Sequence, residues 1–242
     1  MNMDQIGARM AAMLAAILPA IVLIAYLYWY DRKNPEPLSL IFKGFLCGFL
    51  SAGALFILWD FFPTYFLWAN DGVSVLARIK HAFCSAAFAE ETVKLLMLWV
   101  LVSKNPYFDE KFDGMLYAVC VGMGFATHEN IDYVFVKGGN NWHEIAAVRA
   151  VLTVPMHYFC AVVMGYRYSI AKFNTTQGWK RVWQLSTIWT FPVLIHGTFD
   201  AIVMNKHWNI YTNITLTIVV FVFCFIMHKS CNKLLDKYRG IK

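Results

Sequence analysis

The sequence is poor in charged residues, and this shortage excludes an ordinary water-soluble domain. Only 15% of the 242 residues are Asp, Glu, Lys or Arg, whereas 59% are hydrophobic. The mean hydropathy is +0.50. A soluble domain of this length needs far more polar surface to cover its core. The composition therefore indicates a protein that lies within a lipid bilayer.

The chain has six cysteines but no CxxC or CxxH spacing. This absence argues against a disulfide framework and against a zinc site of the finger type, so the cysteines are interpreted as small apolar fillers. The sequence also lacks a long polar connection, an internal repeat and a low-complexity segment. These absences predict one domain over residues 1–242.

Seven apolar stretches are long enough to cross a bilayer, which requires about 20 residues. They cover approximately residues 11–30, 40–59, 79–103, 112–136, 145–171, 183–204 and 208–228. The first is longer than the apolar region of a signal peptide, so we expect it to remain as a permanent span. The predicted fold class is all-α, a polytopic membrane helical bundle of about seven transmembrane helices.

The distribution of lysine and arginine predicts the orientation of the bundle. With seven spans, most of these residues lie in the first, third and fifth loops and in the C-terminal tail. Cytoplasmic loops retain positive charge, so the N-terminus should face outward and the C-terminus the cytoplasm. The net charge of +6 is thereby explained as a topology signal, and we expect no nucleic-acid partner.

Several ionisable side chains fall inside the predicted spans. They are Glu90, Glu91, Lys94, Glu129, Asp132, His157, His196 and Asp200. A charged group at the centre of a spanning helix costs about 2.5–3.5 kcal/mol on insertion scales, so each needs a partner or a hydrated cavity. Their number predicts a functional site.

The third span carries two adjacent glutamates. Glu90 and Lys94 stand four residues apart on one helical face, where a salt bridge can offset part of their burial. That pair alone could be a structural contact. Glu91 points about 100° away and needs another partner. The second carboxylate therefore favours a functional interpretation.

The fourth span combines small residues with a polar run. Gly114, Gly122 and Gly124 permit close approach of neighbouring helices, which is usually ordinary packing. The run from His128 through Glu129 to Asn130 supplies an imidazole, a carboxylate and a carboxamide within one turn. This run marks the fourth span as a second contributor to the site.

Single histidines mark the fifth and sixth spans. His157 follows Pro155, which should loosen the local hydrogen-bond ladder and open the helix toward a cavity. Taken alone, His157 could equally be a hydrogen-bonded core residue. His196 and Asp200 stand four residues apart, so the carboxylate can orient the imidazole as an acid, a base or a metal ligand.

Depth decides whether these groups can meet. At about 1.5 Å of rise per residue, Glu90, Glu129, His157, His196 and Asp200 all fall at overlapping depths in the outer half of the membrane. Four spans can therefore direct polar groups into one pocket that water reaches from outside.

Taken in order, these motifs resemble the PrsW family of bacterial intramembrane proteases. The resemblance covers about residues 26–204 and rests on Glu90-Glu91-x-x-Lys94, the Asp113-Gly114 to Glu129-Asn130 run, His157, and His196-x-x-x-Asp200. The segment from Tyr30-Asp31 to Glu36-Pro37 looks like the family's loop after its first helix. The motif logic is similar to that of the CAAX prenyl endopeptidases and their Abi relatives, which have a histidine where this chain has Glu129-Asn130.

The resemblance implies hydrolysis of peptide bonds in membrane-anchored proteins, such as anti-sigma factors, at the bacterial cytoplasmic membrane. Glu90 or Glu91 would be the general base that activates water. Asn130, His157 or His196 would donate to the developing oxyanion, and Asp200 would hold His196. If one zinc ion is present, Glu129, His157 and His196 are the expected ligands. Metal-free and metal-dependent chemistry both remain open.

Three rival functions remain open at this stage. A seven-span zinc lipid amidase would use histidines and an aspartate, but it would leave the Glu90-Glu91 pair without a role. A proton-coupled transporter would use buried Glu, Asp and His, but the inverted repeat of many transporters is missing. A di-metal carboxylate bundle would need a Glu-x-x-His spacing, which no predicted span contains.

Overall fold

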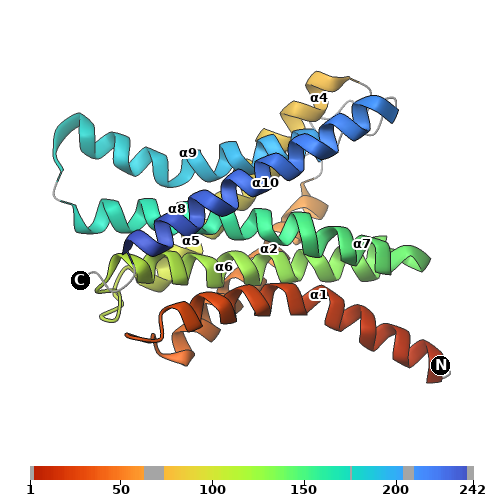
Figure 1. The fold of residues 1–242 in the computed structure, drawn as a ribbon, viewed down its shortest axis with the longest axis horizontal. Helices are drawn as coiled ribbons and strands as arrows, with labels where there is room; N and C mark the ends of the chain where they lie inside the picture. Colours follow the sequence, from red (N-terminus) through yellow and green to blue (C-terminus); the bar gives the residue numbers. More distant parts are fainter. Residues whose placement is uncertain (1–2, 63–73, 175, 204–209, 239–242) are drawn as a thin grey trace.

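The structure is a computed structural model that describes residues 3–62, 74–174, 176–203 and 210–238 (Figure 1). Every regular element in these residues is a helix. This confirms the predicted all-α membrane bundle.

The described residues form seven long helical segments, some of which change helix type along their length. The first is α1 (Met3–Tyr30) and the second α2 (Leu38–Phe61). The third joins α4 (Val75–Lys80), η1 (His81–Ala87) and α5 (Phe88–Val102). The fourth joins α6 (Lys111–Ile131) and η2 (Asp132–Lys137), and the short η3 (Gly139–Asn141) follows it. The fifth joins α7 (Trp142–Val148), η4 (Arg149–Thr153) and α8 (Val154–Phe173). The last two are α9 (Gly178–Val203) and α10 (Ile210–Tyr238).

These segments coincide with the seven stretches that the sequence predicts. Among the described residues, four are both long and apolar enough to cross a membrane, namely residues 6–30, 38–61, 142–173 and 214–238. The other three are the third, fourth and sixth segments, which carry the Glu90-Glu91 pair, Glu129 and Asp200. Their polar groups lower their hydropathy. That all seven segments cross the bilayer stays a prediction, as does the assignment of residues 1–242 to one domain.

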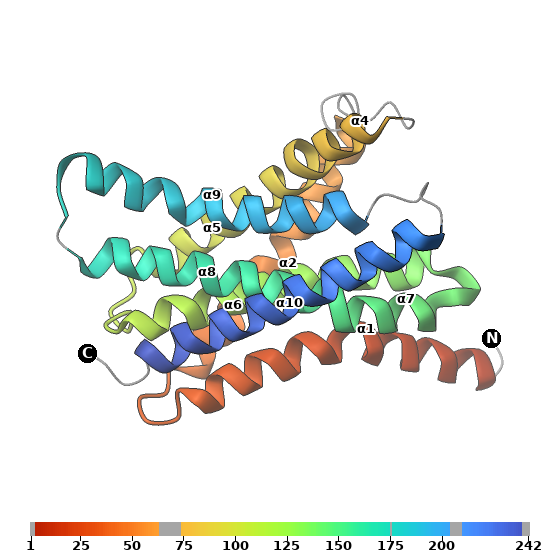
Figure 2. The same ribbon diagram turned by 45° about the horizontal axis from the view of Figure 1, so that its top comes forward.

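Helix α6 occupies the centre of the bundle and packs against α1, α2, α5 and α8 (Figures 1 and 2). Nearly all of its residues are buried. A Cβ atom at Gly124 would overlap the backbone carbonyl of Phe45 in α2, and one at Gly165 of α8 would overlap the carbonyl of Gly114. The close helix approach predicted from the glycines of the fourth span is therefore confirmed.

Three segments are π-helical, with wider turns than an α-helix. They are η1, η2 and η4, and each interrupts or extends a long helix. The last of them directly precedes α8, whose first turn contains Pro155, where the sequence predicts a disturbed hydrogen-bond ladder. Single π-helical turns inside α-helices occur frequently at functional sites. All three segments contribute side chains to the same pocket.

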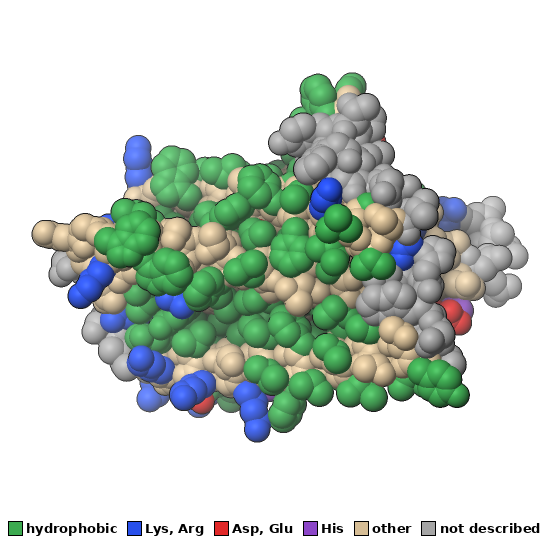
Figure 3. Space-filling view, turned by 90° about the horizontal axis from the view of Figure 1, so that it is seen from above, with side chains coloured by type: hydrophobic (Ala, Val, Ile, Leu, Met, Phe, Trp, Pro, Cys, Tyr) green, Lys and Arg blue, Asp and Glu red, His purple; other side chains and the backbone are tan. Residues whose placement is uncertain are grey.

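The outer surface is suited to lipid. Figure 3 shows hydrophobic side chains over much of the visible face, with Lys and Arg mostly toward its edges. Large apolar side chains are exposed along α1, α2 and α10. Water would be a poor solvent for such a surface, whereas acyl chains are a suitable one. The protein therefore belongs in a membrane.

The alternating direction of the segments decides which residues meet. The C-terminal halves of α2, α6 and α9 lie at the same end of the bundle as η1, the start of α5, and the start of α8 (Figures 1 and 2). The polar residues that the sequence singles out are all in these halves. The fold therefore brings them to one end.

Candidate active site

The two adjacent glutamates of α5 face different surroundings. Glu90 is 4% exposed and lines a pocket of about 670 Å³. Glu91 is fully buried, is not part of the pocket wall, and accepts a hydrogen bond of 2.7 Å from Lys94 Nζ. The sequence alone does not distinguish these carboxylates. In the structure Glu90 faces the pocket and Glu91 lies behind it.

Lys94 connects the glutamates to the fifth segment. Its Nζ atom lies 3.4 Å from Glu90 Oε2 and 3.0 Å from His157 Nδ1, and it stands over the ring of Phe125. The Glu90–Lys94 pair predicted from the spacing is therefore present. The shorter bond, however, runs to Glu91, so the ammonium group mainly compensates the carboxylate that does not face the pocket.

The two histidines face each other across the pocket. Their ring centroids are 5.1 Å apart and the ring planes are nearly perpendicular. His196 Nδ1 contacts Glu91 Oε1 at 2.8 Å, while its Nε2 lies 3.3 Å from Asp200 Oδ2. The predicted His196–Asp200 contact is thus present. Glu91 holds the other side of the same ring, which leaves Nε2 directed toward the pocket carboxylates.

His157 is fixed at both ring nitrogens. Lys94 contacts Nδ1, and Glu129 Oε2 lies 2.9 Å from Nε2. An ammonium group can only donate, so Nδ1 accepts and the proton of the neutral ring is on Nε2, where it is donated to Glu129. His157 is therefore part of a connected polar network and not an isolated core histidine.

The polar run of α6 divides between two environments. Glu129 lines the pocket, whereas Asn130 lies behind it and donates from Nδ2 to the carbonyl of Ala16 at 3.0 Å. His128 packs edge-on against Phe49 and Phe56 and is not part of the pocket wall. Asp132 likewise lies outside that wall and pairs with Lys137 at 2.7 Å. Of the four polar residues, only Glu129 faces the pocket.

The structure adds Arg149, a residue that sequence reasoning missed. It begins η4, is 7% exposed, and lines the pocket. Its Nη2 atom lies 3.1 Å from Glu129 Oε2, and its Nε donates to Asn130 Oδ1 at 2.7 Å. A signal was available, because Arg149 falls inside the predicted span 145–171, where any charged residue needs a partner.

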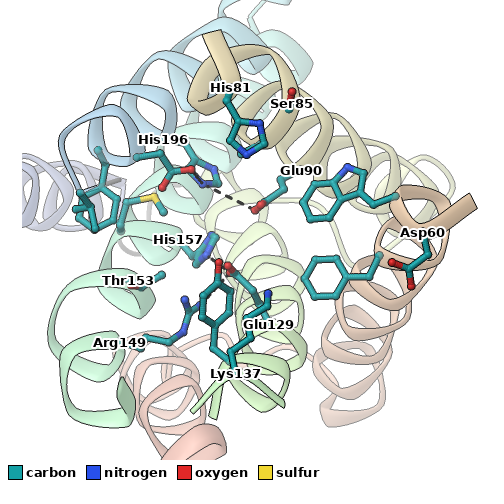
Figure 4. A pocket seen from close by; sticks show the side chains of 18 residues that line it. Asp60, His81, Ser85, Glu90, Glu129, Lys137, Arg149, Thr153, His157 and His196 are labelled. Atoms are coloured by element: carbon teal, nitrogen blue, oxygen red, sulfur yellow. Dashed lines mark hydrogen bonds and ion pairs between the residues drawn. The ribbon is translucent and has the colours of Figure 1, made fainter. Parts of the chain in front are cut away.

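Figure 4 shows how the pocket is arranged. Glu90 and His196 approach each other from α5 and α9, His157 lies between them and Glu129, and Arg149 extends toward Glu129 from the opposite wall. Phe56 and Trp59 of α2 and Phe199 of α9 supply apolar lining. Most of the predicted site residues therefore share one cavity, in which polar groups converge beside apolar walls. The exceptions are Glu91 and Asn130, which support it from behind.

Three of these side chains could hold a metal ion. Among the described residues, one ligand atom each from Glu90, His157 and His196 lie within 4.8 Å of one another, and all three residues are buried. Two imidazoles and one carboxylate are a known donor set of catalytic zinc. An ion at His157 would have to bind an unprotonated ring nitrogen, so it would compete with the Lys94 contact at Nδ1 or with the proton on Nε2. The sequence-based set named Glu129 in place of Glu90, and the choice of the carboxylate ligand stays a prediction.

The fold and the site define a membrane-embedded helical protein with a buried centre of carboxylates and histidines. The family model for "PrsW family intramembrane metalloprotease" matches residues 36–228. The chain belongs to this family, and it is accordingly a membrane-embedded peptidase that acts in a lipid environment on membrane proteins.

Named relatives agree with this assignment over most of their length. The chain is 34% identical to Protease PrsW of Geobacillus kaustophilus, over 81% of this chain and 82% of that protein. It is 32% identical to Protease PrsW of Clostridioides difficile, over 93% and 90% of the two chains. The Protease PrsW of Bacillus subtilis is also 32% identical, over 89% and 92%. No solved structure matches the chain.

Proposed function

We propose that this chain hydrolyses a peptide bond of a membrane-anchored anti-sigma factor, with a water molecule activated at Glu90. The single observation that carries the proposal is the convergence of Glu90, His157 and His196 on one cavity at membrane depth. The substrate class comes from the family resemblance of the sequence motifs.

Among the three glutamates of the site, Glu90 has the most freedom to bind water. Glu129 is engaged at 2.9 and 3.1 Å by His157 and Arg149, and Glu91 at 2.7 and 2.8 Å by Lys94 and His196. Glu90 has only the longer contacts, 3.4 Å to Lys94 and 3.8 Å to His196. A base must reach the proton that it abstracts, so the least engaged of the three glutamates is the best suited.

The reaction needs two proton movements. Glu90 accepts a proton from water as the water oxygen forms a bond to the carbonyl carbon of the substrate. The C–N bond then breaks, and the same proton passes from Glu90 to the leaving nitrogen. Glu91 and Asp200 hold His196 in place, while Lys94 and Glu129 hold His157. The ring positions are thereby set before the substrate arrives.

A zinc ion would fit the same residues, and Glu90, His157 and His196 would hold it. When bound, zinc supplies a Lewis acid that makes water more acidic and polarises the substrate carbonyl. We further propose that the pocket opens to the outer side of the cytoplasmic membrane, with the C-terminus in the cytoplasm.

The test compares two histidines of the predicted spans, His196, which lines the pocket, and His128, which lies outside it. A tagged anti-sigma factor is co-expressed with the full chain, and its cleavage in membranes is followed by immunoblotting. We expect His196→Ala to abolish cleavage and to lower the zinc content of the purified protein. The control His128→Ala should leave both unchanged, because that ring lies outside the pocket. Cleavage at the wild-type rate by His196→Ala would overturn the proposal.

A further inference from the structure

The pocket contains a cation that the roles above do not use. Lys94 is occupied by Glu90, Glu91 and His157, and Lys137 lies at the rim, where it pairs with Asp132. Arg149 is buried, lines the same cavity and begins a π-helical segment. A buried guanidinium is costly unless it is paired, so its presence in the pocket needs an explanation.

The donors expected for the oxyanion from the sequence are already engaged. Asn130 donates to Ala16 and accepts from Arg149, and it is not part of the pocket wall. His157 contacts Lys94 and Glu129 through its two ring nitrogens. His196 contacts Glu91 through Nδ1 and lies beside Asp200 and Glu90 through Nε2. None of the three has a nitrogen without a partner to offer a substrate carbonyl.

Arg149 does have donors to spare. A guanidinium carries five N–H groups. Nε donates to Asn130, and Nη2 lies 3.1 Å from Glu129 but makes no hydrogen bond, whereas Nη1 has no hydrogen-bond or ion-pair partner among the described residues. The contact with Asn130 fixes the plane of the group, and Asn130 is itself tied to α1. Arg149 therefore presents oriented, unused donors from the wall of the cavity.

Its position suits a carbonyl that is attacked at Glu90. Arg149 contacts Glu129, Glu129 contacts His157, and His157 belongs to the donor cluster with Glu90 and His196. Figure 4 shows Arg149 and Glu90 approaching the pocket from opposite walls. A peptide group between them would have its carbon toward the water at Glu90 and its oxygen toward the guanidinium.

We infer that Arg149 is a catalytic residue, which binds the carbonyl oxygen of the scissile peptide and stabilises the negative charge that develops on it. This inference rests on the hydrolysis proposed above and adds the electrophilic group that the reaction needs. Glu129 then has a second role, since it holds the guanidinium while also contacting His157. Donors fixed in advance at an oxyanion are usually a large contribution to catalysis.

The test measures cleavage of the tagged anti-sigma factor by the purified full-length protein reconstituted in lipid vesicles. Loss of an oxyanion donor typically lowers kcat by about 10²–10³-fold. We expect Arg149→Gln to lower kcat to that extent and to leave KM within about threefold, because the lost interaction is made only in the transition state. Arg149→Lys, which keeps the charge but loses the planar fork of donors, should recover only part of the rate.

Matched controls separate a chemical role from a structural one. Arg167→Gln makes the same change on α8, at a residue that stacks on Phe191 outside the pocket, and should leave kcat unchanged. Thermal unfolding in detergent reports whether Arg149→Gln is folded. If it is not, Arg149→Lys alone carries the test, since its charge keeps the pair with Glu129.

Two results would overturn the inference. One is a kcat within threefold of wild type for Arg149→Gln or, where that variant does not fold, for Arg149→Lys. The other is a rise in KM at constant kcat, which would make Arg149 a substrate-binding group only. Glu90→Gln distinguishes this failure from that of the proposed function. If Glu90→Gln is inactive and Arg149→Gln is active, only the role of Arg149 is contradicted. If Glu90→Gln is active, the proposed hydrolysis mechanism itself is contradicted.

Discussion

Two clusters of buried carboxylates lie at opposite ends of this bundle and differ in how their oxygens are used. The pocket cluster consists of Glu90, Glu91, Glu129 and Asp200, with the cations and histidines between them. The loop cluster consists of Glu36, Glu110 and Asp113, with Asn34 and Tyr117, where the connection after α1 meets the start of α6. All of these carboxylates are buried except Asp200, which is half-buried, and of them Glu90, Glu129 and Asp200 line the large cavity.

The carboxylates of the loop cluster accept hydrogen bonds from backbone N–H groups and from neighbouring side chains. Asp113 Oδ2 accepts from the backbone N–H groups of Glu110 and Asp109 at 2.6 and 3.0 Å, and Glu110 completes a capping box at the start of α6. Glu36 accepts from the hydroxyl of Tyr117, and Asn34 donates to Glu110 at 2.9 Å. These carboxylates satisfy helix and loop donors.

The comparison teaches that burial of a carboxylate does not by itself indicate a catalytic role. What distinguishes the pocket cluster is the presence of histidines, a cavity, and a glutamate with only long contacts. We therefore expect substitutions in the pocket to lower cleavage per folded molecule, whatever their effect on stability, and substitutions in the loop cluster to lower stability alone. The following predictions run from the largest expected effect to the smallest.

The largest effect is expected for Lys94→Met, which breaks the pocket network at its centre. Glu91 would lose its 2.7 Å partner and remain as an uncompensated buried charge. Breaking a buried pair in this way costs about 3–5 kcal/mol. Unfolding in detergent should show the loss directly. A stability equal to wild type would mean that Lys94 is not the ion that compensates Glu91.

Glu91→Gln should be milder for stability but still severe for cleavage. His196 Nδ1 and Lys94 would lose their charged acceptor, at a cost of about 1–3 kcal/mol. Because Glu91 also orients His196, the cleavage rate per folded molecule should fall as well. The measurement is kcat normalised to folded protein in vesicles. A normal rate from the folded fraction would remove Glu91 from the active-site support.

Asp113→Ala should show the opposite pattern in the loop cluster. It removes the acceptor for two backbone N–H groups at the start of α6. Lost capping side chains cost about 0.5–2 kcal/mol, and the thermal midpoint should fall accordingly. Cleavage per folded molecule should be unchanged, since the cap is remote from the pocket. A fall in the cleavage rate per folded molecule would contradict the division between the two clusters.

The smallest effect concerns the pH dependence that Glu36 contributes. Burial raises the pKa of this loop carboxyl above its ordinary range; the Tyr117 hydroxyl opposes the rise, and the Asp109 and Glu110 carboxylates add to it. The folded state then binds a proton that the unfolded state releases, so this contribution to stability is full at low pH and is lost as pH rises through the raised pKa.

Thermal midpoints measured from about pH 4.3, the ordinary pKa of glutamate, to neutrality test this point. As pH rises from the ordinary pKa to the raised one, the wild-type midpoint should fall more than that of Glu36→Gln, which carries no titrating group at this position. A wild-type curve parallel to that of the variant would show that the pKa of Glu36 is not raised. Cleavage should be the same for both proteins.

The sequence predicted the helices and most of the site because lipid imposes a simple rule. Apolar runs of about 20 residues mark the segments, and ionisable residues within them must find partners. This rule led to Glu90, His157, His196 and their neighbours. Applied fully, it would also have led to Arg149, which lies in a predicted span.

Other features of the site depend on the direction in which side chains point, and they could not be predicted from the sequence. Adjacent residues such as Glu90 and Glu91 point to different sides of a helix, and only the packing of α5 against α2, α6 and α9 decides which faces the cavity. The π-helical turns at η1, η2 and η4 change those directions further. For the same reason, Asn130 was expected in the pocket but supports Arg149 from behind it.

The most direct test of the central claim is the cleavage rate of Glu90→Gln in lipid vesicles, with Glu110→Gln of the loop cluster as the matched control. A general base typically contributes about 10²–10⁴-fold. We predict a fall of that size for Glu90→Gln, with the fold retained, and a normal rate per folded molecule for Glu110→Gln. Cleavage by Glu90→Gln at the wild-type rate would contradict the account.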